Sequence, residues 1–124
     1  MLSSMPIVEV QIVGDADALP TSLVQRLADA IGEVLESRPQ GTWVKLTVLS
    51  PRHYAENGGM AEGVLPVFVS ILERTDATLA ERTETSLDLA RVVGAACERN
   101  PANVHIIYQA AGAGRVAFGG VLLT

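Results

Sequence analysis

Four short apolar segments, separated by longer polar stretches, dominate the hydrophobic pattern of the chain. They read PIVEVQIV from Pro6, TWVKLTVL from Thr42, PVFVSIL from Pro66 and NVHIIYQ from Asn103. All four are rich in β-branched residues, which are typical of strands. We therefore predict one β-strand in each segment.

The stretch between the first two predicted strands has the period of a helix. Four apolar residues recur at intervals of four, which places them on one helical face. They are Leu23, Leu27, Ile31 and Leu35. Pro20 suits the first turn of this helix and Pro39 its exit.

A second helix is predicted between the last two strands, from near Asp76 to Asn100 and Pro101. We expect its buried stripe to hold a set of apolar and small residues, namely Leu79, Leu87, Ala90, Gly94 and Cys97. A helix that connects neighbouring strands favours their parallel pairing.

The order strand, helix, strand and glycine-rich tail occurs twice. Pro6 and Gly58 are separated by 52 residues, and Pro66 and Gly119 by 53. We therefore expect a single domain over residues 1–124 with internal repeats at about 6–59 and 66–120. The predicted fold class is α/β (α+β), with two tandem βαβ units that form one sheet and two helices on one face of it.

A single layer of helices leaves the other face of the sheet uncovered. Alternating positions on that face, such as Trp43, Lys45, His105 and Ile107, are too mixed in polarity to form a good internal core. Association with further copies of the chain is the natural way to cover it.

Composition and charge narrow the function classes. Hydrophobic residues make up 48% of the 124 residues, but no apolar run approaches the roughly 18 to 20 residues of a membrane span. A net charge of −5, with nine scattered basic residues, argues against nucleic acid or anionic lipid as a partner. The single cysteine, Cys97, and the absence of a signal-like pattern in MLSS lead us to expect a cytoplasmic protein.

The order of these elements resembles the tautomerase superfamily, whose founding member is 4-oxalocrotonate tautomerase. The resemblance rests on a proline directly after Met5, the first strand, the helix, the second strand and a glycine-rich hairpin, and it covers Met5 to Leu122. The doubled pattern is similar to the fused form of the family, which includes macrophage migration inhibitory factor and the cis-3-chloroacrylic acid dehalogenases. The resemblance implies a homotrimer.

In this family an amino-terminal proline acts as base or acid, and Pro6 matches that position. A free α-amine titrates near 7.7 to 8.0, close enough to physiological pH for proton transfer. An internal proline nitrogen is a tertiary amide without useful basicity, and MLSS precedes Met5 in this sequence. Pro66 occupies the equivalent place in the second repeat, so a catalytic and a purely structural role of Pro6 both stay open.

The segment ILERTD after the third strand contains Arg74, at the place where the resemblance implies an arginine that holds a substrate carboxylate. A guanidinium group matches the geometry of a carboxylate well. The equivalent stretch of the first repeat, GDADALP, has no arginine, so one site per chain is expected. The alternative is that Arg74 pairs with Glu73 or Asp76.

Two further residues are candidate substrate contacts. Arg115 lies in the glycine-rich segment GAGRVAFGG, where a contact between subunits is the competing role. Tyr54, in SPRHYAENGG, matches a family position whose aromatic side chain walls the active site.

Neither a nucleotide nor a metal is expected. GAGRVA fits the glycine pattern of a dinucleotide site, but no helix follows it and none of the seven residues after Ala117 is acidic. His53 and His105 lack neighbouring ligands at the spacing of a zinc site. We expect no cofactor.

Among the family's chemistries, hydration needs a carboxylate near the end of the last core strand to activate water. Gln109 occupies that place, and an amide takes no proton from water. The sequence therefore favours a keto-enol tautomerase that moves a proton in small enol or 2-oxo carboxylates. The alternatives are a trimer of the same fold that lacks a free catalytic proline and has a binding or vestigial role, and, less favoured, a hydratase or dehalogenase.

Overall fold

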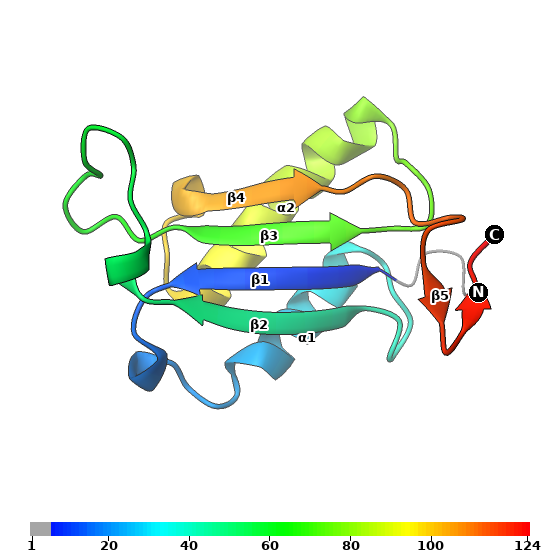
Figure 1. The fold of residues 1–124 in the computed structure, drawn as a ribbon, viewed down its shortest axis with the longest axis horizontal. Coiled ribbons are helices and arrows are strands. Elements are labelled where there is room, and N and C mark those ends of the chain that lie inside the picture. Colours follow the sequence, from blue (N-terminus) through cyan, green and yellow to red (C-terminus); the bar gives the residue numbers. More distant parts are fainter. Residues whose placement is uncertain (1–5) are drawn as a thin grey trace.

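The computed structural model describes residues 6–124 and contains two helices and four main strands (Figure 1). The strands are β1 (Ile7–Val13), β2 (Trp43–Leu49), β3 (Val67–Leu72) and β4 (Val104–Tyr108). The helices are α1 (Leu23–Val34) and α2 (Leu79–Cys97), and the short 3-10 turns are η1 (Ala16–Ala18), η2 (Pro51–His53) and η3 (Pro101–Asn103). A small hairpin of β5 (Ala117–Phe118) and β6 (Val121–Leu122) follows the main sheet.

The four main strands form one mixed sheet in the order β2-β1-β3-β4. Strand β1 is parallel to β2, and β3 is parallel to β4, as expected for strands that are connected through a helix. The two units join through the antiparallel pair of β1 and β3, in which Ile7 lies opposite Leu72. This arrangement confirms the two tandem βαβ units.

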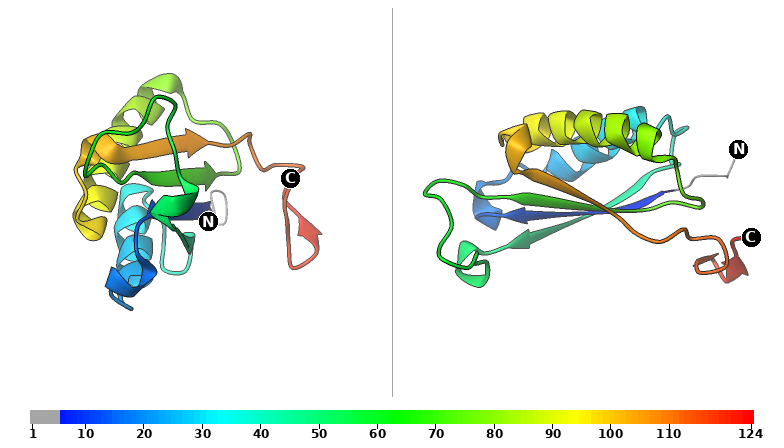
Figure 2. Two further views of the ribbon diagram at one scale, coloured as in Figure 1. Left: turned by 60° about the vertical axis from the view of Figure 1, so that its left-hand side comes forward. Right: turned by 90° about the horizontal axis from the view of Figure 1, so that it is seen from above.

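Both helices cover the same face of the sheet and lie side by side, as Figure 2 shows. Helix α1 buries Leu23, Leu27 and Ile31, the first three residues of its predicted stripe. Helix α2 begins with a capping box, in which the Thr78 hydroxyl accepts from the Glu81 amide and the Glu81 carboxylate accepts from the Thr78 amide. This capping box fixes where the chain turns from loop to helix α2.

The buried stripe of α2 differs from the prediction. Leu79 and Leu87 are 81% and 70% exposed, whereas Leu89 and Val93 are fully buried. Residues 89, 93 and 97 follow a spacing of four and lie on the face toward the sheet, where Cys97 is also buried. The prediction was right for Gly94 and Cys97, which are buried, and wrong for Leu79 and Leu87. The buried face is centred on residues 89, 93 and 97, and Leu87 lies about 200° around the helix from Leu89, beyond the edge of that face.

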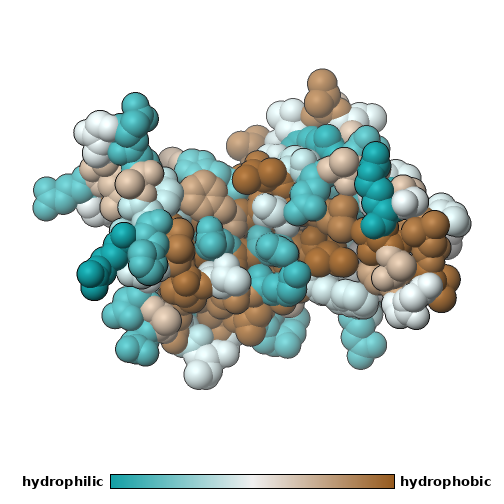
Figure 3. Space-filling model, in the orientation of Figure 1, coloured by the Kyte–Doolittle hydropathy of each residue, from teal (hydrophilic) through white to brown (hydrophobic). Residues whose placement is uncertain are grey.

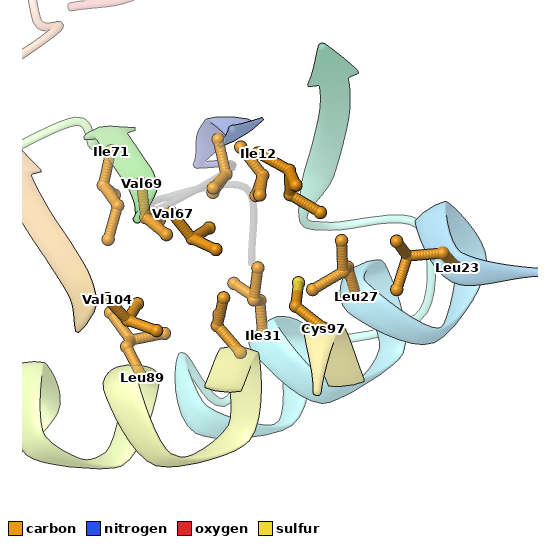
Figure 4. Close-up of a cluster of buried hydrophobic side chains, with 13 residues drawn as sticks. Ile12, Leu23, Leu27, Ile31, Val67, Val69, Ile71, Leu89, Cys97 and Val104 are labelled. Atoms are coloured by element: carbon orange, nitrogen blue, oxygen red, sulfur yellow. The ribbon is translucent and has the colours of Figure 1, made fainter. Parts of the chain in front are cut away.

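The core lies between the sheet and the two helices (Figure 4). Alternate residues of β1 and β3 point into it and meet side chains from both helices. Its members are Val8, Val10, Ile12, Leu23, Leu27, Ile31, Val67, Val69, Ile71, Leu89, Val93, Cys97 and Val104. Burial of each large aliphatic side chain stabilises the fold by about 1.5–3 kcal/mol.

The opposite face of the sheet is open, and apolar and polar side chains alternate over it (Figure 3). Trp43 is 45% and Ile107 is 51% exposed. Lys45 forms an ion pair of 2.9 Å with Glu9 on the neighbouring strand. This face has the mixed character that the sequence predicts. Within residues 6–124, no helix is both long and apolar enough to cross a bilayer.

Candidate active site

Pro6 and Arg74 are brought to the same end of the sheet by the antiparallel pairing of β1 and β3. Pro6 is buried directly before β1, and its carbonyl oxygen accepts a hydrogen bond of 3.0 Å from the Trp43 amide. Because Ile7 lies opposite Leu72, the start of β1 is adjacent to the end of β3. Arg74 follows β3 by two residues, so sequence-distant segments converge here (Figure 1).

A small cavity of ≈ 10 Å³ lies at this junction. Its lining combines the start of β1, the end of β3 and the C-terminal part of the chain. The lining residues are Ile7, Leu72, Glu73, Arg74, Gly112, Val116, Phe118 and Leu123. This volume is about that of one water molecule, whereas sites for small ligands usually measure about 300–1,000 Å³. The cavity is therefore closed to a substrate in this conformation.

The guanidinium of Arg74 is occupied by the chain's own backbone. Its Nε donates a hydrogen bond of 3.0 Å to the main-chain oxygen of Thr124, and its Nη2 donates to the same oxygen. Among residues 6–124, Arg74 forms an ion pair with neither of the expected alternative partners, Glu73 and Asp76, and Asp76 pairs instead with Arg82 at 3.2 Å. Arg74 is partly buried, and two of its N–H groups converge on the Thr124 oxygen.

The segment that reaches Arg74 is the C-terminal arm, defined here as residues 117–124. It turns at Gly119 and Gly120, whose φ values of 58° and 88° suit glycine. The ring of its Phe118 packs edge-on against Trp43, with 5.3 Å between ring centroids. Figure 2 shows that the hairpin of this arm stands beyond the end of the main sheet.

Glu73 lies between the cavity and helix α2. Burial raises the pKa of its carboxyl above the ordinary value, and the charge of Arg82 partly offsets this. Arg82 itself pairs with Asp76 and lies over the ring of Tyr108, 4.7 Å from the centroid. Arg82 is therefore committed to other partners, and Arg74 is the cationic residue that lines the cavity.

Arg115 does not line the cavity, although residues near it in the sequence do. Its Nη1 donates 3.0 Å to the carbonyl oxygen of Ala111, and the residue is exposed. Gly112 and Val116, on either side of it, do line the cavity. A substrate contact by Arg115 stays a prediction.

Tyr54 lies at the opposite end of the sheet from Pro6, next to η2 (Figure 1). Its hydroxyl donates 2.6 Å to Glu56, and this hydrogen bond raises the pKa of Tyr54. Its ring packs near Phe68, with centroids 5.9 Å apart, on the open face of the sheet. One chain therefore does not bring Tyr54 to the cavity, and its predicted role at the active site requires a neighbouring chain.

Sequence reasoning missed Phe118, Leu123 and Thr124 as residues of this site. The Gly119-Gly120 pair predicts a hairpin, but no pattern in the sequence indicates where that hairpin docks. GAGRVA contains a turn at residues 113–115 and ends in β5, so a hairpin rather than a helix follows this turn. Residues 6–124 contain no group of three or more histidine, cysteine, aspartate or glutamate side chains arranged to hold a metal ion.

No protein-family model matches the sequence, and no curated protein matches it either. Solved structures do share its architecture. A fused 4-OT wild-type symmetric trimer matches with a TM-score of 0.74 and 17% identity, covering 94% of each chain. A macrophage migration inhibitory factor from Oncomelania hupensis matches with a TM-score of 0.74 and 13% identity, covering 95% of this chain and 82% of that one.

The chain has the tautomerase-superfamily fold. A third structure with this fold is Pt0534 inactivated by 2-oxo-3-pentynoate, with a TM-score of 0.74, 14% identity and 94% coverage of each chain. At these identities the tautomerase-superfamily fold is shared, and the chemistry has to be argued from the residues of this chain.

Proposed function

We propose that the protein is a keto-enol tautomerase that acts on small enol or 2-oxo carboxylates, with Pro6 as base and Arg74 as the anchor for the carboxylate. The observation that carries the proposal is the convergence of the start of β1 and the end of β3 on one cavity, which Arg74 lines. The inactivation of Pt0534, a protein of the same fold, by a 2-oxo acid supports this substrate class.

The proposed reaction is a proton shuttle by one nitrogen. The Pro6 amine accepts the proton of the substrate's 2-hydroxyl group as the carbonyl forms, and returns that proton to a carbon of the conjugated chain. Arg74 holds the carboxylate so that the substrate stays aligned between the two steps. An α-amine with an ordinary pKa near 7.7–8.0 needs only modest desolvation to be neutral at physiological pH.

This chemistry requires a mature chain that begins at Pro6. The residues before Pro6, including Met5, lie outside the described residues. In the printed sequence Pro6 is joined to Met5, and in that form its nitrogen is an amide without a basic lone pair. A binding protein of the same fold is therefore the second candidate, because it needs no free proline.

Hydration is less well supported than tautomerisation. Gln109 directly follows β4, and its backbone N–H donates a hydrogen bond of 2.9 Å to the carbonyl oxygen of Ile71. A side-chain amide at this place does not activate water as a carboxylate would. The proton-shuttle reaction needs no such group.

We further propose a cytoplasmic homotrimer of single-domain chains, with neither nucleic acid nor membrane as a partner. The open, mixed face of the sheet and the unpaired outer edges of β2 and β4 within residues 6–124 favour contact with further copies. A fused 4-OT protein of this fold is described as a trimer. A neighbouring chain would then supply Tyr54 and, in the alternative role, contact Arg115.

The deciding experiment compares two forms of the protein, one that begins at Met1 and one that begins at Met5 and is trimmed to Pro6. Intact mass spectrometry verifies the first residue of each form. We expect phenylenolpyruvate or 2-hydroxydienoate tautomerase activity from the form with a free Pro6, and almost none from the longer form. Pro6→Ala in the trimmed form is the control. Equal rates in all three proteins would refute the role of Pro6 as base.

A further inference from the structure

The contact between Arg74 and Thr124 engages the donors with which an arginine binds an anion. Two N–H groups of the guanidinium, Nε and Nη2, donate to one main-chain oxygen of Thr124. Arginine uses the same edge of its guanidinium to hold the two oxygens of a carboxylate. The backbone oxygen therefore occupies the place that the carboxylate of a substrate would take.

Side chains of the C-terminal arm also fill the space in front of Arg74. Phe118 and Leu123 line the cavity together with Ile7 and Leu72, and only ≈ 10 Å³ is left between them. Displacement of the arm would free the guanidinium and the apolar space next to β1 in one movement. The arm and a substrate thus exclude each other.

Beyond its contacts with Arg74, Trp43 and the cavity, the arm makes few hydrogen bonds to the rest of residues 6–124. Leu123 makes two backbone hydrogen bonds, one of 2.8 Å from its amide to Val116 and one of 2.6 Å from the Gly114 amide to its carbonyl. Val121 is 73% and Leu122 is 53% exposed, and β5 and β6 pair only with each other among the described strands. Segments with little burial and few hydrogen bonds open at low free-energy cost.

We propose that the C-terminal arm is a cap on the active site, which a small carboxylate displaces by competing with the Thr124 oxygen for Arg74. This inference rests on the proposed role of Arg74 as the carboxylate anchor. The apparent affinity for a carboxylate is then the intrinsic affinity reduced by the fraction of chains in which the cap is open. Weakening the cap raises that affinity without any new contact to the ligand.

Trp43 reports the position of the cap. It is the only tryptophan of the chain, and its ring packs against Phe118 of the arm. Displacement of Phe118 exposes one side of the indole to water, which shifts its fluorescence emission to longer wavelength. The emission therefore measures the cap directly and does not depend on catalysis.

The test titrates the protein with 2-oxobutanoate and with 2-butanone, which lacks the carboxylate, and follows both Trp43 emission and heat of binding. We expect 2-oxobutanoate to produce a saturable red shift with the midpoint found by calorimetry, and 2-butanone to produce none. Arg74→Ala without ligand should already show the shifted emission, since it cannot hold Thr124. Arg91→Ala, which removes an exposed arginine of α2, is the control and should keep the wild-type emission.

A second variant tests the competition itself. Leu123→Ala removes apolar contact from the cap but leaves Arg74 intact, so we expect it to bind 2-oxobutanoate about threefold to tenfold more tightly than the wild type. If 2-oxobutanoate binds without a change in Trp43 emission, and Leu123→Ala binds it with the affinity of the wild type, the cap is overturned while the carboxylate anchor stands. No binding by either protein would overturn both the anchor and the cap.

Discussion

Arg74 is joined to Thr124, fifty residues further along the chain, by two hydrogen bonds to one main-chain oxygen. This contact links the end of β3 to the end of the C-terminal arm, at the end of the sheet where β1 begins. An arginine that the sequence assigns to substrate is thus engaged by the protein itself. Arg74 belongs both to the lining of the cavity and to the attachment of the C-terminal arm, so a substitution of Arg74 affects both.

Helix α2 offers a matched pair of leucines that tests which of its faces is buried. Leu89 is fully buried, and Leu87, two residues earlier, is 70% exposed. We expect Leu89→Ala to lower the free energy of unfolding by about 2–5 kcal/mol, because it leaves a cavity in the core. Leu87→Ala should change it by less than about 0.5 kcal/mol. Urea unfolding measures both, and equal losses would contradict the observed orientation of the helix.

The proposed trimer is tested by two variants, one with an aspartate on the open face of the sheet and one with an aspartate on the helical side. Ile107 is half exposed on the open face of the sheet, whereas Leu87 is exposed on the helical side. An aspartate in an apolar contact between subunits is desolvated without a partner, which costs several kcal/mol. We therefore expect Ile107→Asp to dissociate the trimer at micromolar concentration and Leu87→Asp to leave it intact.

Sedimentation equilibrium measures the assembly of the wild type and of both variants. Circular dichroism verifies that each variant is folded. A monomeric wild type would refute the trimer outright. A trimeric Ile107→Asp variant would show that the open face of the sheet is not the interface.

The buried thiol of Cys97 makes stability depend on alkaline pH. Burial raises the pKa of this thiol to about 11 from an ordinary value of 9.0. Because the unfolded chain loses the proton first, the contribution of Cys97 to stability is complete below about pH 9 and falls as the pH rises toward 11. The difference in unfolding free energy between the wild type and Cys97→Ala should therefore shrink over this range. Urea unfolding at pH 8 and pH 10.5 tests this, and a constant difference would contradict it.

Most of the fold was predictable because its signals are local. The four strands are marked by β-branched segments, and the stripe of Leu23, Leu27 and Ile31 identifies the buried face of α1. The repeat then indicates the pairing of strands, since a helix between two strands favours a parallel arrangement. The mixed polarity of Trp43 and Ile107 correctly indicates an uncovered face.

The candidate site was only partly predictable because it depends on contacts that sequence spacing does not encode. The second helix contains apolar residues on two faces, so its spacing placed Gly94 and Cys97 correctly but did not separate the exposed Leu87 from the buried Leu89. Arg74 was identified by its motif, but its partner was sought among nearby acids and is instead Thr124. The distance of Tyr54 from the cavity follows from strand direction, because β2 is parallel to β1 and therefore ends at the far end of the sheet from the start of β1.

The role of Arg74 as a carboxylate anchor predicts a difference between substrates. In Arg74→Ala, an enol that carries a carboxylate loses its ionic contact, and we expect its kcat/KM to fall by the equivalent of about 2 to 4 kcal/mol in transition-state stabilisation. An enolisable ketone without a carboxylate makes no such contact, so its kcat/KM should not fall. The kcat/KM of Arg74→Ala for this ketone rises if release of the C-terminal arm opens the cavity. The measurement uses the form of the protein that begins at Pro6, with both substrates and with Arg91→Ala as the control. Equal losses on the two substrates would show that Arg74 only secures the C-terminal arm and does not bind the substrate.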